Sequence, residues 1–202
     1  DGYDVHPAKA GPDFIDPSHH QQVAGRPSRT LDAWLQGEDG LRRNYPRSDT
    51  PNSPTEVTTS TDICVVEGVM GLYDGNGSST ARIAELLDVP VVLIVDASAG
   101  MESVAATALG FAAYADRTAH EVEVAGVIAQ RAHGGRHADG IREALPDELA
   151  YCGRVPPRDD LEIPDRHLGL RMGEEAPLDK AALDAAAETL RTDRLLDIAR
   201  EP

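Results

Sequence analysis

The chain has 202 residues, of which 41% are hydrophobic, and its formal net charge at pH 7 is −16. This apolar content is sufficient for a folded core and excludes wholesale disorder. The negative charge argues against binding to nucleic acid or to an anionic membrane surface, because both need clustered Lys and Arg. No segment approaches the roughly 18 consecutive apolar residues that a membrane-spanning helix requires.

The basic residues are nearly all arginine, with Lys9 and Lys180 as the only lysines. An acidic surface poor in lysine indicates a high-salt cytoplasm, where ions screen the repulsion between carboxylates. Cys64 and Cys152 each lie in an apolar, strand-like run and have no CxxC spacing. We interpret both as core thiols in a reducing cytoplasm rather than as catalytic or metal-binding groups.

Apolar, β-branched runs alternate with helical patterns along the chain. We predict strands at 3–9, 61–67, 90–96, 121–129 and 149–156. Helices are predicted at 79–88, 101–115, 137–145 and 178–200, the last broken near 192–193, and residues 17–43 are expected to be partly helical. This alternation predicts an α/β fold, a three-layer Rossmann-like parallel sheet with helices on both faces. We expect one domain over 1–202, with a mobile surface loop at about 44–60.

Ligands of such sheets bind at the carboxyl ends of the strands, and the first predicted strand ends at Lys9. The stretch "KAGPDFIDPSHH" (9–20) then places Asp13 and Asp16 three residues apart, which brings both carboxylates to one side of a helical turn. One lysine and two acids favour a magnesium-phosphate site, since Mg²⁺ binds carboxylate, phosphate and water oxygens. A turn with a helix-capping Asp explains the same residues, so both interpretations stay open.

The stretch "VVEGVMGLYDG" (65–75) ends an apolar strand in Glu67 and continues with Gly68, Gly71 and Asp74. A carboxylate that closes a buried strand needs a cationic partner, which a metal ion would supply. Glycines would let backbone and phosphate approach each other closely. The alternative is a glutamate paired with an arginine, next to glycines that only turn the chain.

Other polar residues carry weaker signals. Asp96 closes the most apolar strand, and we expect Asp96 or Ser98 to satisfy the backbone of the next loop and to cap a helix. His19 and His20 are adjacent, so their side chains should diverge into surface or local hydrogen bonds. No G-x-x-x-x-G-K-[ST] motif occurs in these residues, so a phosphate-binding loop of that kind would lie upstream of them.

Five motifs occur together and in order between residues 9 and 170. As an ordered set they resemble the amidating domain of the cobyrinic acid a,c-diamide synthase family, including the members that act on hydrogenobyrinic acid. The motifs are "KAGPDFIDPSHH", "GRPSRTLD", "VVEGVMGLYDG", "VVLIVDASAGMESVAATALGF" and "IPDRHLGL".

The resemblance implies a phosphate-loop fold similar to that of dethiobiotin synthetase, and a ligase of cobalamin biosynthesis. Family members use ATP and magnesium to phosphorylate the c and then the a side-chain carboxylate of a corrin substrate, cobyrinic acid. Ammonia displaces the phosphate to give the amide, and it comes from glutamine hydrolysed by a C-terminal glutaminase domain. The expected location is the cytoplasm, and a homodimer is left open.

The resemblance also implies roles for individual residues of this sequence. Lys9 would contact phosphate. Asp13 and Asp16 would help to bind magnesium-ATP and orient the reacting carboxylate, and Glu67, together with Asp16, would hold magnesium. Positioned magnesium and lysine charges would neutralise the phosphate and align the reactants.

Three further roles follow the same motifs. Asp74 matches an acid associated with the substrate or intermediate, and Gly68 and Gly71 lie in the cofactor-binding stretch. Gln130 stands where relatives usually carry Asn at a base-recognition position, which leaves the nucleotide specificity open.

The sequence does not begin with Met and opens in a strand-like run, and neither a phosphate loop nor a glutaminase domain is recognisable in it. We therefore expect a fragment of the synthase that is inactive alone. Alternatives are a hydrogenobyrinate a,c-diamide synthase, an enzyme resembling dethiobiotin synthetase or cobyric acid synthase, and a degenerate nucleotide-binding regulatory module.

The charge balance generates the first prediction. With a net charge of −16, the chain should lose its folded state below about 1 M salt, because self-repulsion of the carboxylates is then poorly screened. Circular dichroism during thermal unfolding, in a series of KCl concentrations, measures how the stability of the folded state depends on salt. Full stability in dilute buffer would sink the high-salt interpretation.

Overall fold

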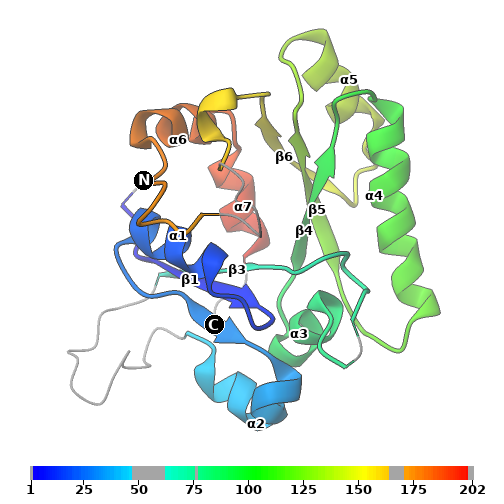
Figure 1. Cartoon of the computed structure of the whole chain (residues 1–202). Coiled ribbons are helices and arrows are strands. Elements are labelled where there is room, and N and C mark those ends of the chain that lie inside the picture. Colours follow the sequence, from blue (N-terminus) through cyan, green and yellow to red (C-terminus); the bar gives the residue numbers. More distant parts are fainter. Residues whose placement is uncertain (1, 47–61, 76, 164–170, 200–202) are drawn as a thin grey trace. The chain divides into compact units, whose positions relative to one another are not determined.

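The computed structural model of the chain describes residues 2–46, 62–75, 77–163 and 171–199 (Figure 1). The chain folds into two compact units. Unit 1 comprises Asp1–Leu87 and Ile163–Pro177, and unit 2 comprises Asp88–Glu162 and Leu178–Arg200. The predicted loop at about 44–60 lies almost wholly outside the described residues, as does most of the motif "IPDRHLGL".

Unit 1 is built on a parallel sheet in the order β2-β1-β3. Lys9 on the first strand lies opposite Glu67 on the third, and Ala10 lies opposite Leu31 on the second. The carboxyl ends of all three strands therefore meet at one edge of the sheet. The strands are β1 (Val5–Ala10), β2 (Arg29–Leu31) and β3 (Ile63–Glu67).

The helices of unit 1 each follow a strand, and α1 packs on β1. Their bounds are α1 (Ile15–Ala24), α2 (Ala33–Asn44) and α3 (Thr80–Leu87). Helix α2 has a capped N-terminus, because the Asp32 side chain accepts hydrogen bonds from the backbone N–H groups of Trp34 and Leu35. Such a cap satisfies donors that the first turn leaves without a helical partner.

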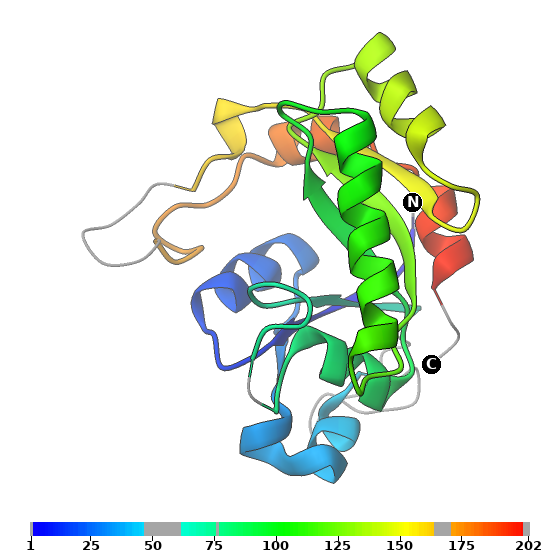
Figure 2. The same ribbon diagram turned by 90° about the vertical axis from the view of Figure 1, so that its right-hand side faces the viewer.

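Unit 2 is built on a second parallel sheet, in the order β4-β5-β6. Helices α4 and α5 lie on one side of it and α6 and α7 on the other (Figure 1), and Figure 2 shows α4 running across β4 and β5. The elements are β4 (Val91–Asp96), α4 (Glu102–Tyr114), the 3₁₀ turn Ala115–Arg117, β5 (Val124–Gln130), α5 (Arg136–Ala144), β6 (Ala150–Val155), the 3₁₀ turn Asp159–Leu161, α6 (Lys180–Ala187) and α7 (Thr192–Ile198).

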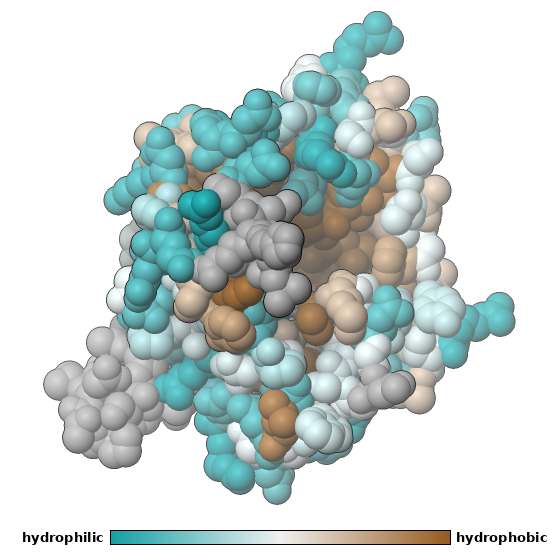
Figure 3. Space-filling model, in the orientation of Figure 1, coloured by the Kyte–Doolittle hydropathy of each residue, from teal (hydrophilic) through white to brown (hydrophobic). Residues whose placement is uncertain are grey.

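Each unit has an apolar interior with an exposed apolar strand edge. Ala8, Leu31 and Leu41 are fully buried in unit 1, and Val127 and Ile141 are fully buried in unit 2. By contrast, Val65 on β3 is 53% exposed and Ile94 on β4 is 66% exposed. β3 and β4 are the outer strands of their sheets, and parallel strands are normally covered on both faces. Figure 3 shows hydrophilic side chains over most of the outer helices in that view.

The α/β prediction is confirmed, with parallel strands near every predicted position and helices on both faces of the unit 2 sheet. The strands are hydrogen-bonded as two sheets of three. The sequence missed β2, since Arg29–Leu31 is only three residues long and lies in a region predicted as helical. The expected break in the last helix falls at 188–191, between α6 and α7, where Arg191 N–H donates to the Cys152 carbonyl of β6.

Membrane insertion by a helix has no support in the described part of the chain, where every helix is too short or too polar to span a bilayer.

The interpretation of both cysteines as core thiols makes a second prediction. Burial raises the pKa of the Cys64 thiol to about 12 and also raises that of Cys152, which is fully buried on β6. At pH 8 the thiolate of Cys64 should thus be about a thousandfold rarer than in an unfolded chain, because each pKa unit changes the thiolate fraction roughly tenfold. Mass spectrometry after iodoacetamide treatment, with and without urea, measures the difference. Equally fast alkylation in both conditions would show that the thiols are not core groups.

Candidate functional site

The ammonium group of Lys9 is the centre of the candidate site in unit 1. Lys9 is only 3% exposed, although it sits at the carboxyl edge of the sheet. Its Nζ donates a 2.6 Å hydrogen bond to the carbonyl of Gly68 and lies 3.4 Å from Asp16 Oδ2 and 3.9 Å from Glu67 Oε1. A buried ammonium is costly unless it is paired, so these contacts offset the cost of burying the Lys9 side chain.

Asp13 and Asp16 lie at the start of α1 and form a hydrogen-bonded pair. Asp13 also accepts a 2.8 Å hydrogen bond from the backbone N–H of Ile15, so it helps to order the first turn of the helix. Asp16 instead turns toward Lys9. The two interpretations left open by the sequence therefore divide between the residues: Asp13 has a role at the helix start, and Asp16 belongs to the charged cluster.

The two carboxyl groups differ in acidity. Burial pushes the pKa of Asp13 upward, but hydrogen bonds from Ile15 and Asp16 and the charge of Lys9 bring it below its ordinary value. The pKa of Asp16 lies above its ordinary value, because burial, the hydrogen bond with Asp13 and the negative charge of Glu67 outweigh Lys9. The pKa values of the two carboxyl groups are thus shifted in opposite directions, and together with Glu67 these acids outnumber the single ammonium of Lys9 in the cluster.

Glu67 has a second partner that the sequence analysis did not assign to the site. The Nε2 atom of His20 lies 2.7 Å from Glu67 Oε2, while its Nδ1 atom lies 3.0 Å from Ser28 Oγ. His19 points elsewhere and contacts the carbonyl of Arg171, so the predicted divergence of the two histidines is correct. The expectation of surface or local hydrogen bonds is wrong for His19, which is buried and contacts a residue 152 positions away. The helical spacing of Asp16 and His20, four residues apart, was the available signal, because such residues share one helix face.

Neighbouring side chains approach the glycines after Glu67 closely. A Cβ on Gly68 would lie 3.0 Å from Thr80 Oγ1, and a Cβ on Gly71 would lie 2.2 Å from Asp74 Oδ2. Asp74 is exposed and folds back over Gly71, and its backbone N–H donates to the Gly71 carbonyl. Among the described residues we find no hydrogen bond or ion pair between Asp74 and the Lys9 cluster.

The donor set of the cluster fits a magnesium ion that uses few protein ligands. Within the described residues no three His, Cys, Asp or Glu side chains form a ready metal-binding group. Asp16 and Glu67 nevertheless converge on the single cation Lys9. Mg²⁺ usually takes one or two carboxylates and completes its shell with phosphate and water, which matches this pair. A divalent cation would also favour the charged form of Asp16, whose pKa is raised by burial and then by the neighbouring carboxylates.

Gln130 lies in unit 2 at the carboxyl end of β5 and is exposed. Next to it, Arg131 has a left-handed backbone (φ 57°) and pairs with Asp96, whose pKa falls to about 2 because of that partner. Asp96 Oδ1 also accepts a hydrogen bond from the backbone N–H of Ser98, as predicted for the loop. The capping part of that prediction is wrong, since α4 begins at Glu102 and its N-cap residue, Met101, gives no side-chain cap.

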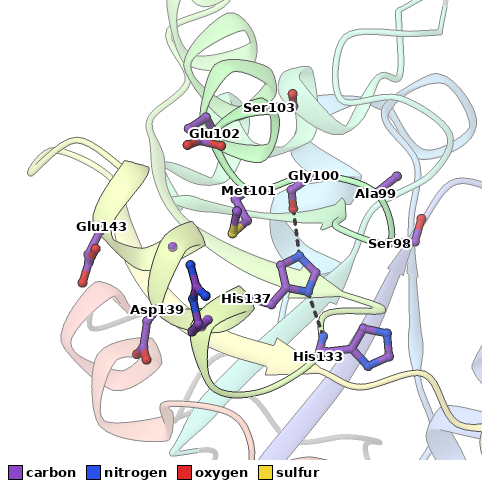
Figure 4. A pocket seen from close by; sticks show the side chains of 12 residues that line it. Ser98, Ala99, Gly100, Met101, Glu102, Ser103, His133, His137, Asp139 and Glu143 are labelled. Atoms are coloured by element: carbon purple, nitrogen blue, oxygen red, sulfur yellow. Dashed lines mark hydrogen bonds between the residues drawn. The ribbon is translucent and has the colours of Figure 1, made fainter.

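A cavity of about 910 Å³ lies in unit 2 beside the starts of α4 and α5 (Figure 4). His137 crosses it and links two loops. Its Nδ1 accepts from the backbone N–H of His133, so Nε2 must carry the proton that it donates to the Gly100 carbonyl at 2.9 Å. The imidazole is therefore fixed as one neutral tautomer by structural contacts.

Comparison with known proteins identifies relatives of the whole chain. The family model described as "AAA domain" matches residues 26–165. Cobyrinate a,c-diamide synthases from Halobacterium salinarum and Haloarcula marismortui are 65% and 66% identical over 201 residues, and hydrogenobyrinate a,c-diamide synthase from Thermobifida fusca is 40% identical over 195 residues. These matches cover 100%, 100% and 94% of this chain but only 43%, 43% and 39% of the relatives, so the chain spans less than half their length. No solved structure was found to match.

The Lys9 cluster makes a third prediction. Replacing Lys9 with Met removes the positive charge that opposes the upward shift at Asp16, so the pKa of Asp16 should rise further. Carboxyl ¹³C NMR during a pH titration measures it, and Lys180→Met on α6 is the matched control because it changes the only other lysine. An Asp16 pKa that is the same in both variants would contradict the contact with Lys9.

Proposed function

Because this chain belongs to the AAA domain family, we propose that it forms the ATP-dependent amidating part of a cobyrinate a,c-diamide synthase. The names of the two relatives above 60% identity support the substrate class. The observation that carries the proposal is the convergence of Asp16 and Glu67 on buried Lys9 at the carboxyl edge of the unit 1 sheet. This is the position where parallel α/β sheets bind their ligands.

The proposed reaction has two steps. A side-chain carboxylate oxygen of cobyrinic acid attacks the γ-phosphorus of ATP, the bond to the bridging oxygen of ADP breaks, and an acyl phosphate forms. Ammonia then attacks the acyl carbon, phosphate leaves with the former carboxylate oxygen, and the nitrogen loses a proton to give the amide. Both reactants of the first step are anions, so the site must supply positive charge and alignment.

Lys9 is proposed to supply one fixed charge against the transferred phosphoryl group. Its stem is buried and its ammonium is held by the Gly68 carbonyl, so the charge is oriented before the reactants arrive. Asp16 and Glu67 would hold magnesium, which when bound neutralises phosphate charge and orients the ATP. Asp13 would fix Asp16 through their hydrogen bond, and His20 would fix Glu67.

Other assignments belong to the same proposal. Asp74 would act toward the substrate or intermediate, and the backbone at Gly68 and Gly71 would face phosphate. Gln130 would contact the nucleotide base, which its exposed position at the end of β5 permits. The substrate would be cobyrinate rather than hydrogenobyrinate, since two relatives named for cobyrinate are 65% and 66% identical, whereas the hydrogenobyrinate relative from Thermobifida fusca is 40% identical.

Parts outside these residues would complete the enzyme. A phosphate-binding loop and its strand would pair with a free sheet edge, and the exposed Val65 and Ile94 on β3 and β4 are compatible with such pairing. Glutamine-derived ammonia would come from a glutaminase domain, and the reaction would take place in the cytoplasm. A homodimer stays a prediction, which light scattering on the purified synthase would test.

The magnesium assignment makes a fourth prediction. Glu67→Gln in the whole synthase should lower magnesium-dependent turnover by about 100-fold, because it removes a charge that acts on the transferring group. The melting temperature without ligand should change little, since the Glu67 side chain is 46% exposed. Its increase on adding magnesium and ATP should shrink, and that increase is a readout independent of turnover.

The control is Glu38→Gln on α2, an exposed glutamate that pairs with Arg82 away from the site. It should keep both turnover and the ligand-induced rise in melting temperature. If Glu67→Gln instead loses stability and activity in equal measure, Glu67 is a structural partner of Lys9 and His20 and not a metal ligand.

A further inference from the structure

Four large apolar side chains are exposed on the segments that leave the carboxyl edge of the unit 1 sheet, where the charged cluster lies. Phe14 is 70% exposed, Trp34 77%, Leu35 57% and Met70 77%. Scattered exposed apolar residues are ordinary, but several gathered around one polar site indicate a binding surface. We call these four residues the apolar rim.

Sheet register places the rim at one end of the strands. Phe14 follows β1, Trp34 and Leu35 follow β2, and Met70 follows β3. The three strands are parallel and in register at their carboxyl ends, so the segments that leave them start side by side. Phe14 adjoins Asp13, and Met70 is three residues beyond Glu67. The rim and the charged cluster therefore share their connecting segments.

These connecting segments also contact one another. A Cβ built on Gly11 would lie 3.6 Å from Val69 Cγ1, which joins the segment after β1 to the segment after β3. The backbone N–H of Ala33 donates a 3.1 Å hydrogen bond to Ser78 Oγ, which joins the start of α2 to the segment after β3. The segments that carry the four rim residues are therefore linked to one another by contacts.

The rim residues are held on ordered backbone. Buried Asp32 accepts from the N–H groups of Trp34 and Leu35, so both belong to a capped helical turn. Met70 adopts a left-handed backbone (φ 51°), which is unfavourable for a residue with a side chain and is retained mainly at functional positions. A backbone that is already ordered loses little conformational freedom when a ligand covers it.

We propose that the apolar rim binds the edge of the corrin macrocycle and thereby positions its carboxylate arm beside Lys9. This inference rests on the function proposed above and names the residues that select its substrate. A corrin is a wide ring with many methyl groups, and its reacting carboxylate sits on a short arm. Once that carboxylate lies in the cluster, the ring would lie against the connecting segments beside the cluster, which carry the rim residues.

Charge favours the same occupant. Cobyrinic acid carries several carboxylates, and the chain has a net charge of −16, so unscreened charge opposes binding. The four rim residues are uncharged and expose aromatic, aliphatic and thioether groups. They attract the ring by apolar contact without adding repulsion, and an adaptable methionine suits an irregular ring edge.

The test uses the whole synthase and compares KM for cobyrinic acid with KM for ATP. Trp34→Ala and Phe14→Ala should each raise KM for cobyrinic acid by about tenfold or more, while KM for ATP stays unchanged. Trp34→Phe should retain most of the affinity because it keeps an aromatic face. Leu109→Ala on α4 is the control, since Leu109 is also exposed (46%) but lies in unit 2.

Trp34 also gives a direct readout, because it is the only tryptophan of this chain. The fluorescence difference between the wild-type synthase and Trp34→Phe isolates its emission, which cobyrinic acid should quench at the concentration of half-saturation. If the synthase amidates cobyrinic acid but neither KM nor Trp34 emission responds, the rim inference is wrong and the proposed function stands. If Trp34 is already shielded from acrylamide before substrate is added, another segment covers the rim and the inference is also overturned. If the wild-type synthase does not amidate cobyrinic acid, the proposed function fails first.

Discussion

The pairing of the Lys9 ammonium with surrounding carboxylates is the interaction on which the first sheet and its site depend. Parallel register puts Lys9 opposite Glu67, and helix α1 brings Asp16 to the same point. The buried ammonium of Lys9 would be unfavourable without these partners. The carboxyl groups of Asp16 and Glu67 outnumber the single ammonium that they surround. In the proposed function, this excess of carboxyl groups is what would let the site accept a further cation.

The backbone that follows β3 contacts the Lys9 cluster and includes two glycines, Gly68 and Gly71. Gly68 gives its carbonyl to Lys9 and leaves room for Thr80, whose hydroxyl accepts from the Val69 backbone. Gly71 leaves room for Asp74. The contact with Thr80 disfavours a side chain at Gly68, whereas the exposed Asp74 carboxylate beside Gly71 can move aside. Glycine at both positions also leaves the backbone open to a phosphate, which the proposed function would use.

Most strands and the charged residues of the site could be predicted from the sequence, because each depends on a pattern of neighbouring residues. The apolar runs marked β3 and β4, and the rule that ligands bind at strand ends pointed to Lys9 and Glu67. Three features were not accessible. β2 is too short to leave a pattern, the division into two sheets depends on long-range pairing, and the partnership of His20 with Glu67 joins residues far apart in the sequence. Exposure of Trp34 and Met70 likewise could not be derived, since apolar residues in a sequence normally predict burial.

The central claim is that a carboxylate becomes phosphorylated beside Lys9, Asp16 and Glu67. The most direct measurement follows an oxygen atom. Cobyrinic acid labelled with ¹⁸O in its side-chain carboxylates is converted by the whole synthase with ATP, magnesium and glutamine, and the released phosphate is analysed by mass spectrometry. The account predicts one ¹⁸O atom in the phosphate for each amide formed. Unlabelled phosphate, or release of AMP and pyrophosphate, would contradict it.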